Sequence, residues 1–159
     1  MFHIFFRQVL SLRLRRSLAL NSMKIDVARL SEGREVEFFE EWDPKIFDLE
    51  APGISYVGPL AVRAYVSKES GVVGVRVVLK ANTTLTCSRC FKEFSSLLDK
   101  TLKMIYPLDK ERKIFPVDGN IREELMLTYP QKILCQEDCK GLCIRCGADL
   151  NDEKCRCKV

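Results

Sequence analysis

Apolar and polar residues alternate along the middle of this 159-residue chain with a period of two, which is typical of β-strands. Apolar side chains occupy every second position over residues 60–66 and again over residues 73–81, and Ser70–Gly71 between the two runs is typical of a turn. Over residues 94–106 apolar side chains again recur mostly at even positions, although a helix also fits part of this run. We therefore predict three long strands, the second and third joined by a hairpin.

Shorter β-like segments precede these strands. Residues 23–30 and residues 35–42 each favour a short strand. In the second segment, Phe38–Phe39 and Trp42 are expected in the core rather than on a surface that binds a partner. Residues 43–59 contain three prolines and two glycines, so turns and short edges are expected there.

A short helix is expected near the end of the apolar part of the chain. Asn120 is suited to cap it, residues 121–129 (IREELMLTY) would form it, and Pro130 would end it. The predicted fold class is α+β and predominantly antiparallel β. A β-meander or barrel-like domain with one short helix spans residues 23–130, and a C-terminal cysteine-rich zinc-binding segment spans residues 131–159.

The eight cysteines are the strongest chemical signal in the chain. They include two C-x-x-C knuckles, CSRC and CIRC, and a knuckle holds two sulfurs on one turn, as a tetrahedral ion with Zn–S bonds of about 2.3 Å requires. Eight thiols make two complete tetrahedral sets, so two structural zinc ions are expected. The predicted metal ligands are Cys87, Cys90, Cys135, Cys139, Cys143, Cys146, Cys155 and Cys157.

The eight ligands can be divided between two ions in two ways. In the first division, the four cysteines from Cys143 onward close on one ion, and the CSRC pair takes Cys135 and Cys139 from the C-terminal segment. In the second division, Cys139 joins the distal set and Cys135 stays free. The first division is preferred because it leaves no thiol without a partner, and the second stays open.

Other uses of the cysteines fit the sequence less well. Disulfides are disfavoured because no clean secretory signal is present and because a bridge within the Cys155–Cys157 pair would be strained. The ligand spacing of ferredoxin iron–sulfur clusters is absent. A single iron held by the same knuckles stays an open alternative to zinc.

Catalysis has little support in the sequence. The only histidine is His3, so the rest of the chain offers no imidazole base. Four-thiolate sites are closed, whereas a catalytic zinc keeps an open position. Neither a nucleotide-binding glycine motif nor a nucleophile elbow is present. The chain is therefore not expected to be an enzyme.

Positive charge is concentrated at the N-terminus. Residues 1–22 carry four arginines and no acid, and the remaining 22 basic residues are balanced by 22 acidic residues. The body is therefore not a general polyanion binder. We expect residues 1–22 to be a flexible extension or to precede a true start at Met23; a transit peptide and a basic RNA-binding tail are alternative interpretations. The arginines interrupt the apolar stretch that a membrane span needs, so no membrane contact is expected.

A local basic face remains a route to nucleic acid. Residues 100–113 hold five cations beside the aromatic rings of Tyr106 and Phe115, a combination that can bind RNA through phosphate contacts and stacking. An ordinary solvated loop is the alternative interpretation. The candidate RNA-contact residues are Lys100, Lys103, Lys110, Arg112 and Lys113.

Two longer motifs surround the cysteines: LTCSRCFKEF at residues 85–94, and LCQEDCKGLCIRCGADLN at residues 134–151, which is followed by CRC. Both resemble the YceD family of large-subunit ribosomal RNA accumulation proteins, and the resemblance in overall layout covers residues 23–159. The family often has proline where this chain has Ile144, and asparagine where it has Asp149. Both changes leave the cysteines intact.

The resemblance implies a factor in ribosome biogenesis that supports accumulation or processing of the large-subunit (23S) ribosomal RNA without being an enzyme. The expected partners are ribosomal RNA, a large-subunit assembly intermediate or a ribosomal protein, and the expected location is the cytoplasm. The residues themselves predict a metal-stabilised β module with no evident catalytic machinery, and together with the resemblance they suggest that it acts as a zinc-stabilised scaffold. The alternative function is a zinc-ribbon module that binds protein or nucleic acid in transcription.

Overall fold

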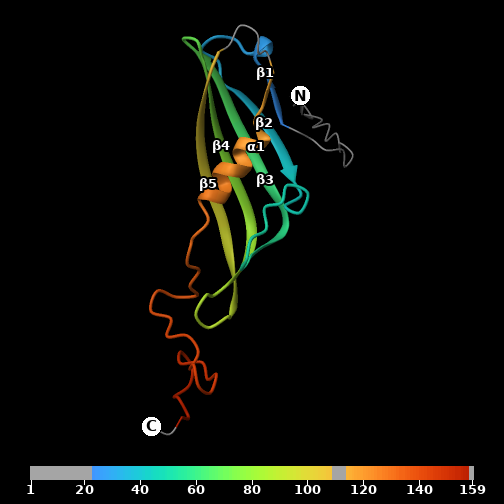
Figure 1. Cartoon of the computed structure of the whole chain (residues 1–159). Coiled ribbons are helices and arrows are strands. Elements are labelled where there is room, and N and C mark those ends of the chain that lie inside the picture. Colours follow the sequence, from blue (N-terminus) through green and yellow to red (C-terminus); the bar gives the residue numbers. More distant parts are fainter. Residues whose placement is uncertain (1–22, 109–113, 158–159) are drawn as a thin grey trace, which may run out of the picture.

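The computed structural model describes residues 23–108 and 114–157 (Figure 1). Its main sheet is an antiparallel meander of four strands in the order β2-β3-β4-β5. A second sheet pairs β1 with β6. The predicted fold, predominantly antiparallel β with a short helix, is confirmed. The elements are β1 (Lys24–Asp26), the 3-10 helix η1 (Val27–Arg29), β2 (Val36–Trp42), β3 (Ile54–Glu69), β4 (Val72–Thr86), β5 (Glu93–Pro107), β6 (Ile114–Pro116) and α1 (Asp118–Leu127).

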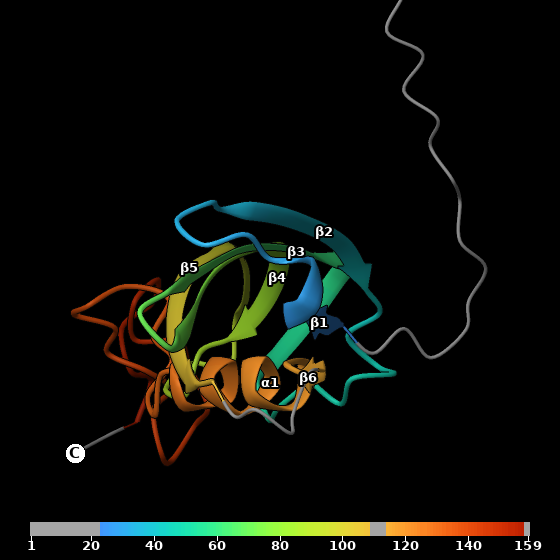
Figure 2. The same ribbon diagram turned by 90° about the horizontal axis from the view of Figure 1, so that it is seen from above.

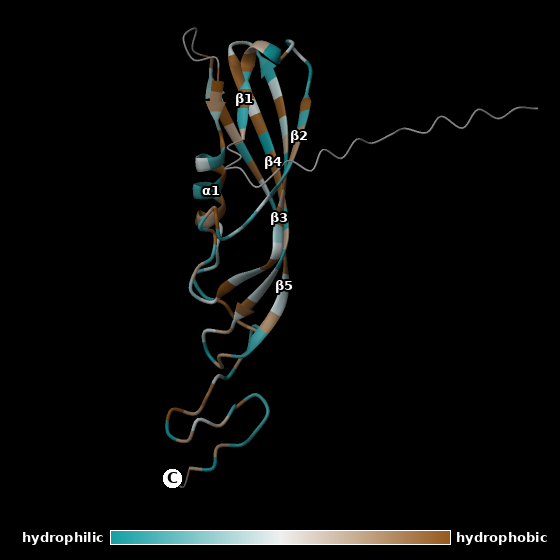
Figure 3. Ribbon diagram, turned by 90° about the vertical axis from the view of Figure 1, so that its right-hand side faces the viewer, coloured by the Kyte–Doolittle hydropathy of each residue, from teal (hydrophilic) through white to brown (hydrophobic). Residues whose placement is uncertain are grey.

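One face of the main sheet carries the core. Every second residue over 60–66 on β3 and over 73–81 on β4 is buried, because successive side chains of a strand point to opposite faces. β1, β6 and α1 lie over this face (Figure 2), and they add the buried side chains of Ile25, Phe115 and Leu125. In a side view α1 lies on one side of the sheet (Figure 3). None of the helices in the described ranges is long and apolar enough to cross a membrane.

The helix α1 begins earlier than predicted. Its N-cap is Val117, which makes no side-chain cap bond, so the expected cap at Asn120 is wrong. Val117 is buried, and its carbonyl accepts the N–H of Ile121 at 2.9 Å, so core packing sets the first turn. At the other end the Thr128 hydroxyl donates to the Leu125 carbonyl at 2.7 Å, which closes the helix before Pro130.

Strand β3 also begins earlier than predicted, at Ile54 within the stretch expected to form turns. The pairing of β3 with β4 shifts register between Val57 and Ala61, around Gly58 and Pro59. A β-bulge accommodates proline, which has no N–H to donate to the ladder. The proline therefore marks a bulge inside the strand rather than its boundary.

The aromatic residues of β2 do not all lie in the core. Trp42 is 1% exposed and stacks on Phe47 with ring centroids 4.2 Å apart, as expected of a core residue. Phe38 packs against the core, but its neighbour Phe39 is 54% exposed on the opposite face of the sheet. The prediction for Phe39 was wrong because adjacent residues of a strand cannot share a face.

Candidate metal centres

The C-terminal segment runs from α1 past the tip of the β4–β5 hairpin, where a first cysteine group forms (Figure 1). Cys87 and Cys90 lie in the turn between β4 and β5, and Cys135 and Cys139 lie in the segment. The four Sγ atoms lie within 4.8 Å of one another. The Sγ atoms of Cys87 and Cys139 are 3.7 Å apart, and those of Cys90 and Cys135 are 3.6 Å apart. We call these four residues the proximal group.

A second group of four cysteines follows in the same segment. Cys143, Cys146, Cys155 and Cys157 also have their Sγ atoms within 4.8 Å of one another, and we call them the distal group. The Sγ atom of Cys143 lies 3.3 Å from that of Cys155 and 3.9 Å from that of Cys157. The structure thus groups the thiols as in the first of the two divisions open in the sequence. Metal ligation by these residues stays a prediction.

The sulfur spacing fits a tetrahedral ion and excludes disulfides within these groups. Sulfurs at about 2.3 Å from a zinc ion lie about 3.8 Å apart along the edges of a tetrahedron. A disulfide would bring two of them to about 2.0 Å. The observed separations of 3.3–3.9 Å match the former, and the cysteines of both groups are free.

Backbone hydrogen bonds shape the proximal group. Ser88 donates its N–H to the Ile133 carbonyl at 2.8 Å, and Leu142 donates to the Arg89 carbonyl at 3.2 Å. Gly141 lies against the same knuckle, where a Cβ atom would come within 3.0 Å of the Arg89 carbonyl oxygen. These contacts place two separate stretches of the C-terminal segment against the hairpin tip.

The thiols of each group differ in their readiness to ionise. Burial disfavours the charged thiolate of Cys87 and would raise its pKa. Backbone N–H groups that donate to the sulfur have a larger opposite effect and lower the pKa of Cys87 to about 6. Burial and the neighbouring thiols raise the pKa of Cys135 to about 12. In the distal group, backbone N–H groups lower the pKa of Cys143 to about 6, and hydrogen bonding with Cys155 raises the pKa of Cys157 to about 12. Four thiolates can coexist at this spacing when a cation lies between them.

Nearby cations bind groups of the protein itself. Arg89 donates from Nη1 to the Cys139 carbonyl, and Lys92 pairs with Asp152 at 3.8 Å. Arg156 pairs at 2.6 Å with an acid of its own loop. These contacts hold all three cations on groups of the protein itself.

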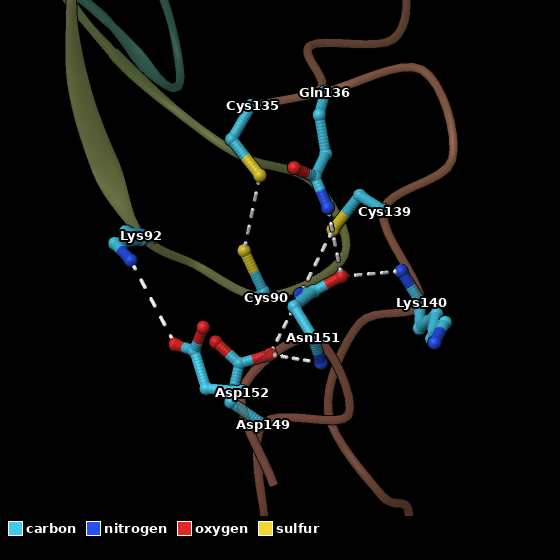
Figure 4. A network of polar contacts seen from close by, with 9 residues as sticks. All are labelled: Cys90, Lys92, Cys135, Gln136, Cys139, Lys140, Asp149, Asn151 and Asp152. Carbon is cyan, nitrogen blue, oxygen red and sulfur yellow. Dashed lines mark hydrogen bonds and ion pairs between the residues drawn. The ribbon is translucent and has the colours of Figure 1, made fainter.

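The sequence did not single out Asn151, which joins the two groups (Figure 4). Its side-chain Nδ2 donates to Cys139 Sγ at 3.4 Å, and its Oδ1 accepts the N–H of Lys140 at 2.8 Å. Asp149 Oδ1 accepts the backbone N–H of Asn151 at 2.9 Å and fixes its orientation. No spacing rule points to this residue, because it lies in the loop of one group and contacts a cysteine of the other.

The candidate RNA-contact residues do not form one surface within the described part of the chain. Lys100 and Lys103 are both exposed on β5, but they are three residues apart and so lie on opposite faces of the strand. Lys103 is paired in register with Arg76 of β4. Lys110, Arg112 and Lys113 lie outside the described residues, as does the N-terminal extension, residues 1–22.

The part of the chain that carries the cysteine segment matches a known protein family. Residues 109–159 match the family described as "Large ribosomal RNA subunit accumulation protein YceD". A relative from Arabidopsis thaliana, "Large ribosomal RNA subunit accumulation protein YCED homolog 1, chloroplastic", is 36% identical over 62 residues. That alignment covers 39% of this chain and 19% of the relative. No solved structure matches this chain.

The matched stretch therefore spans about a fifth of that relative's length. The family match contains the whole distal group and two cysteines of the proximal group, Cys135 and Cys139. The resemblance seen in the cysteine motifs is therefore confirmed, and the cysteine-rich C-terminal part of the chain is similar to the YceD family.

Proposed function

We propose that this protein is a cytoplasmic scaffold, not an enzyme, that supports the accumulation or processing of large-subunit (23S) ribosomal RNA. The observation that carries the proposal is the pair of four-cysteine groups, one of which ties the family-matched segment to the β4–β5 hairpin. A closed four-thiolate site has no open position for a substrate. Such a site stabilises the conformation of a surface. The printed names of the matching family and of the chloroplast relative support ribosomal RNA as the target.

We infer that zinc occupies both groups and that it folds the segment. Among the described residues beyond α1, the buried apolar side chains are those of Ile133 and Cys139, which is too little for a core. A structural zinc ion can stabilise such a segment by about 10–16 kcal/mol. Elemental analysis of the purified protein should give close to two zinc ions per chain. A value near one would refute the two-site assignment, and a visible ferric absorption band would replace zinc with iron.

The function is tested by purifying the tagged full chain from cells at low salt and identifying what comes with it. We expect large-subunit ribosomal RNA and ribosomal proteins to be enriched over small-subunit RNA. A Cys87→Ser, Cys90→Ser double variant is the matched control, because it should release the segment from the hairpin and lower that enrichment. Enrichment of the transcription machinery instead would favour the alternative function as a zinc-ribbon module.

A further inference from the structure

Phe91 occupies a backbone conformation that glycine normally takes. It directly follows the CSRC knuckle, and its φ angle is +57°. In the CIRC knuckle the equivalent residue is Gly147, with a φ angle of +72°. The two turns are the same, because Phe91 donates its N–H to the Cys87 carbonyl at 3.0 Å and Gly147 donates to the Cys143 carbonyl at 2.9 Å.

This conformation is unfavourable for an aromatic residue. The left-handed region brings Cβ close to the backbone, so a bulky residue with positive φ is a genuine outlier. The other non-glycine residues with positive φ in the described ranges are Asp48 and Ser70, whose small polar side chains can bond locally. Glycine at position 91 would form the same turn without this strain.

The ring of Phe91 contributes little to the packing of the protein. The side chain is 68% exposed and belongs to neither of the clusters of packed apolar residues. A strained backbone conformation at a residue with an exposed side chain indicates a role in binding rather than in packing. Apart from the buried Cys90, the nearest residues along the chain are polar and exposed: Ser88, Arg89, Lys92 and Glu93.

We propose that the Phe91 ring stacks on an unpaired base of ribosomal RNA, a proposal that rests on the proposed function above. A base offers a flat face to a lone exposed ring, and stacking needs no wider apolar patch. Lys92 follows the ring directly, and its pair with Asp152 is exposed and 3.8 Å long. Such surface pairs are weak, so the ammonium group is free to move to a phosphate beside the stacked base. A pocket on a protein partner would instead require apolar neighbours around the anchor.

The test compares three variants of the full chain on transcribed fragments of 23S ribosomal RNA. Phe91→Gly removes the ring and the strain, Phe91→Trp keeps a ring, and Ile144→Ala is the control. Ile144 is fully exposed in the other knuckle, and its φ is not positive. We expect Phe91→Gly to bind about 5- to 140-fold more weakly, the range that loss of one stacked base gives. We expect the other two variants to bind within about twofold of the wild type, since neither loses a stacking contact.

Two further readouts separate stacking from other roles. The slope of log affinity against log salt should not change in Phe91→Gly, because the variant loses no charge. Its melting temperature should equal or exceed that of the wild type, because the strain is relieved. A lower melting temperature, or RNA affinity equal to that of the wild type, would overturn the proposal. Unchanged RNA affinity with loss of a co-purifying protein would assign the ring to a protein partner. If the wild type itself binds none of the fragments, the proposed function fails, and the stacking role fails with it.

Discussion

The side-chain amide of Asn151 donates to Cys139 Sγ across 3.4 Å, and this contact joins the two cysteine groups. Asn151 lies in the distal loop between Cys146 and Cys155, whereas Cys139 is a fully buried member of the proximal group. A second contact lies one residue further along the loop, where Asp152 pairs with Lys92, which lies two residues after Cys90 of the proximal group. The fold of the distal loop therefore determines the surroundings of a proximal thiol.

We predict that Asn151→Asp weakens metal binding at the proximal group about 10- to 100-fold, the usual effect of losing a group that bonds to a ligand. The variant exchanges an N–H donor for a carboxylate beside a thiolate, and the two negative charges repel. Competition with a chelator measures the effect. Asn82→Asp is the matched control, because Asn82 is exposed on β4 and belongs to neither cysteine group. Equal affinity in both variants would show that the amide does not act on the metal site.

We predict that Cys87→Ser and Cys155→Ser expose different parts of the chain to protease. Cys87 lies at the hairpin tip and shares its group with two cysteines of the C-terminal segment, so its loss should expose both the hairpin and the segment to protease. Cys155 shares its group only with cysteines from Cys143 onward, so its loss should expose that part alone. Limited proteolysis with mass spectrometry reads the cleavage sites. Loss of hairpin protection in Cys155→Ser to the same extent would show that the ligand division is wrong.

Strands β3 to β5 could be predicted because each has one buried face, and burial of one face imposes a period of two on the sequence. The knuckles could be predicted because metal geometry constrains the spacing of their ligands. Phe39 could not be placed, since composition alone does not tell which of two adjacent aromatic residues points inward. The helix start also escaped prediction, because Val117 is fixed by contacts with residues distant in sequence. Asn151 was also missed, because its role depends on a contact with Cys139, which lies outside its own loop.

We predict that two aromatic residues of one strand differ sharply in their contribution to stability. Trp42→Ala should lower the free energy of unfolding by about 3–5 kcal/mol, because it empties a buried position stacked on Phe47. Phe39→Ala, three residues away on the exposed face, should cost less than about 1 kcal/mol. Denaturant titration of both metal-loaded variants measures the difference. Equal losses would contradict the orientation of β2.

We predict that both groups bind metal more tightly as the pH rises. With the thiols in the arrangement of the structure and no metal between them, Cys135 and Cys157 hold their protons at neutral pH because their pKa values are raised to about 12, whereas Cys87 and Cys143, with pKa values lowered to about 6, are mostly thiolates. Metal-bound cysteines are thiolates, so the bound state carries fewer protons than the free state and each ion releases protons on binding. By linkage, affinity rises with pH, and it falls faster once the pH drops below about 6, where the remaining thiolates also take up protons.

Calorimetric titration of the demetallated chain with zinc, in two buffers of different ionisation enthalpy, counts the protons released. We expect at least one proton per ion at neutral pH, since each group contains a thiol that is protonated until the ion arrives. Cys155→Ser provides the control, because it disrupts the distal group and should leave proton release from the proximal group in place. An affinity that does not vary with pH would mean that the thiols are not the ligands, since binding to a protonated thiol must displace its proton.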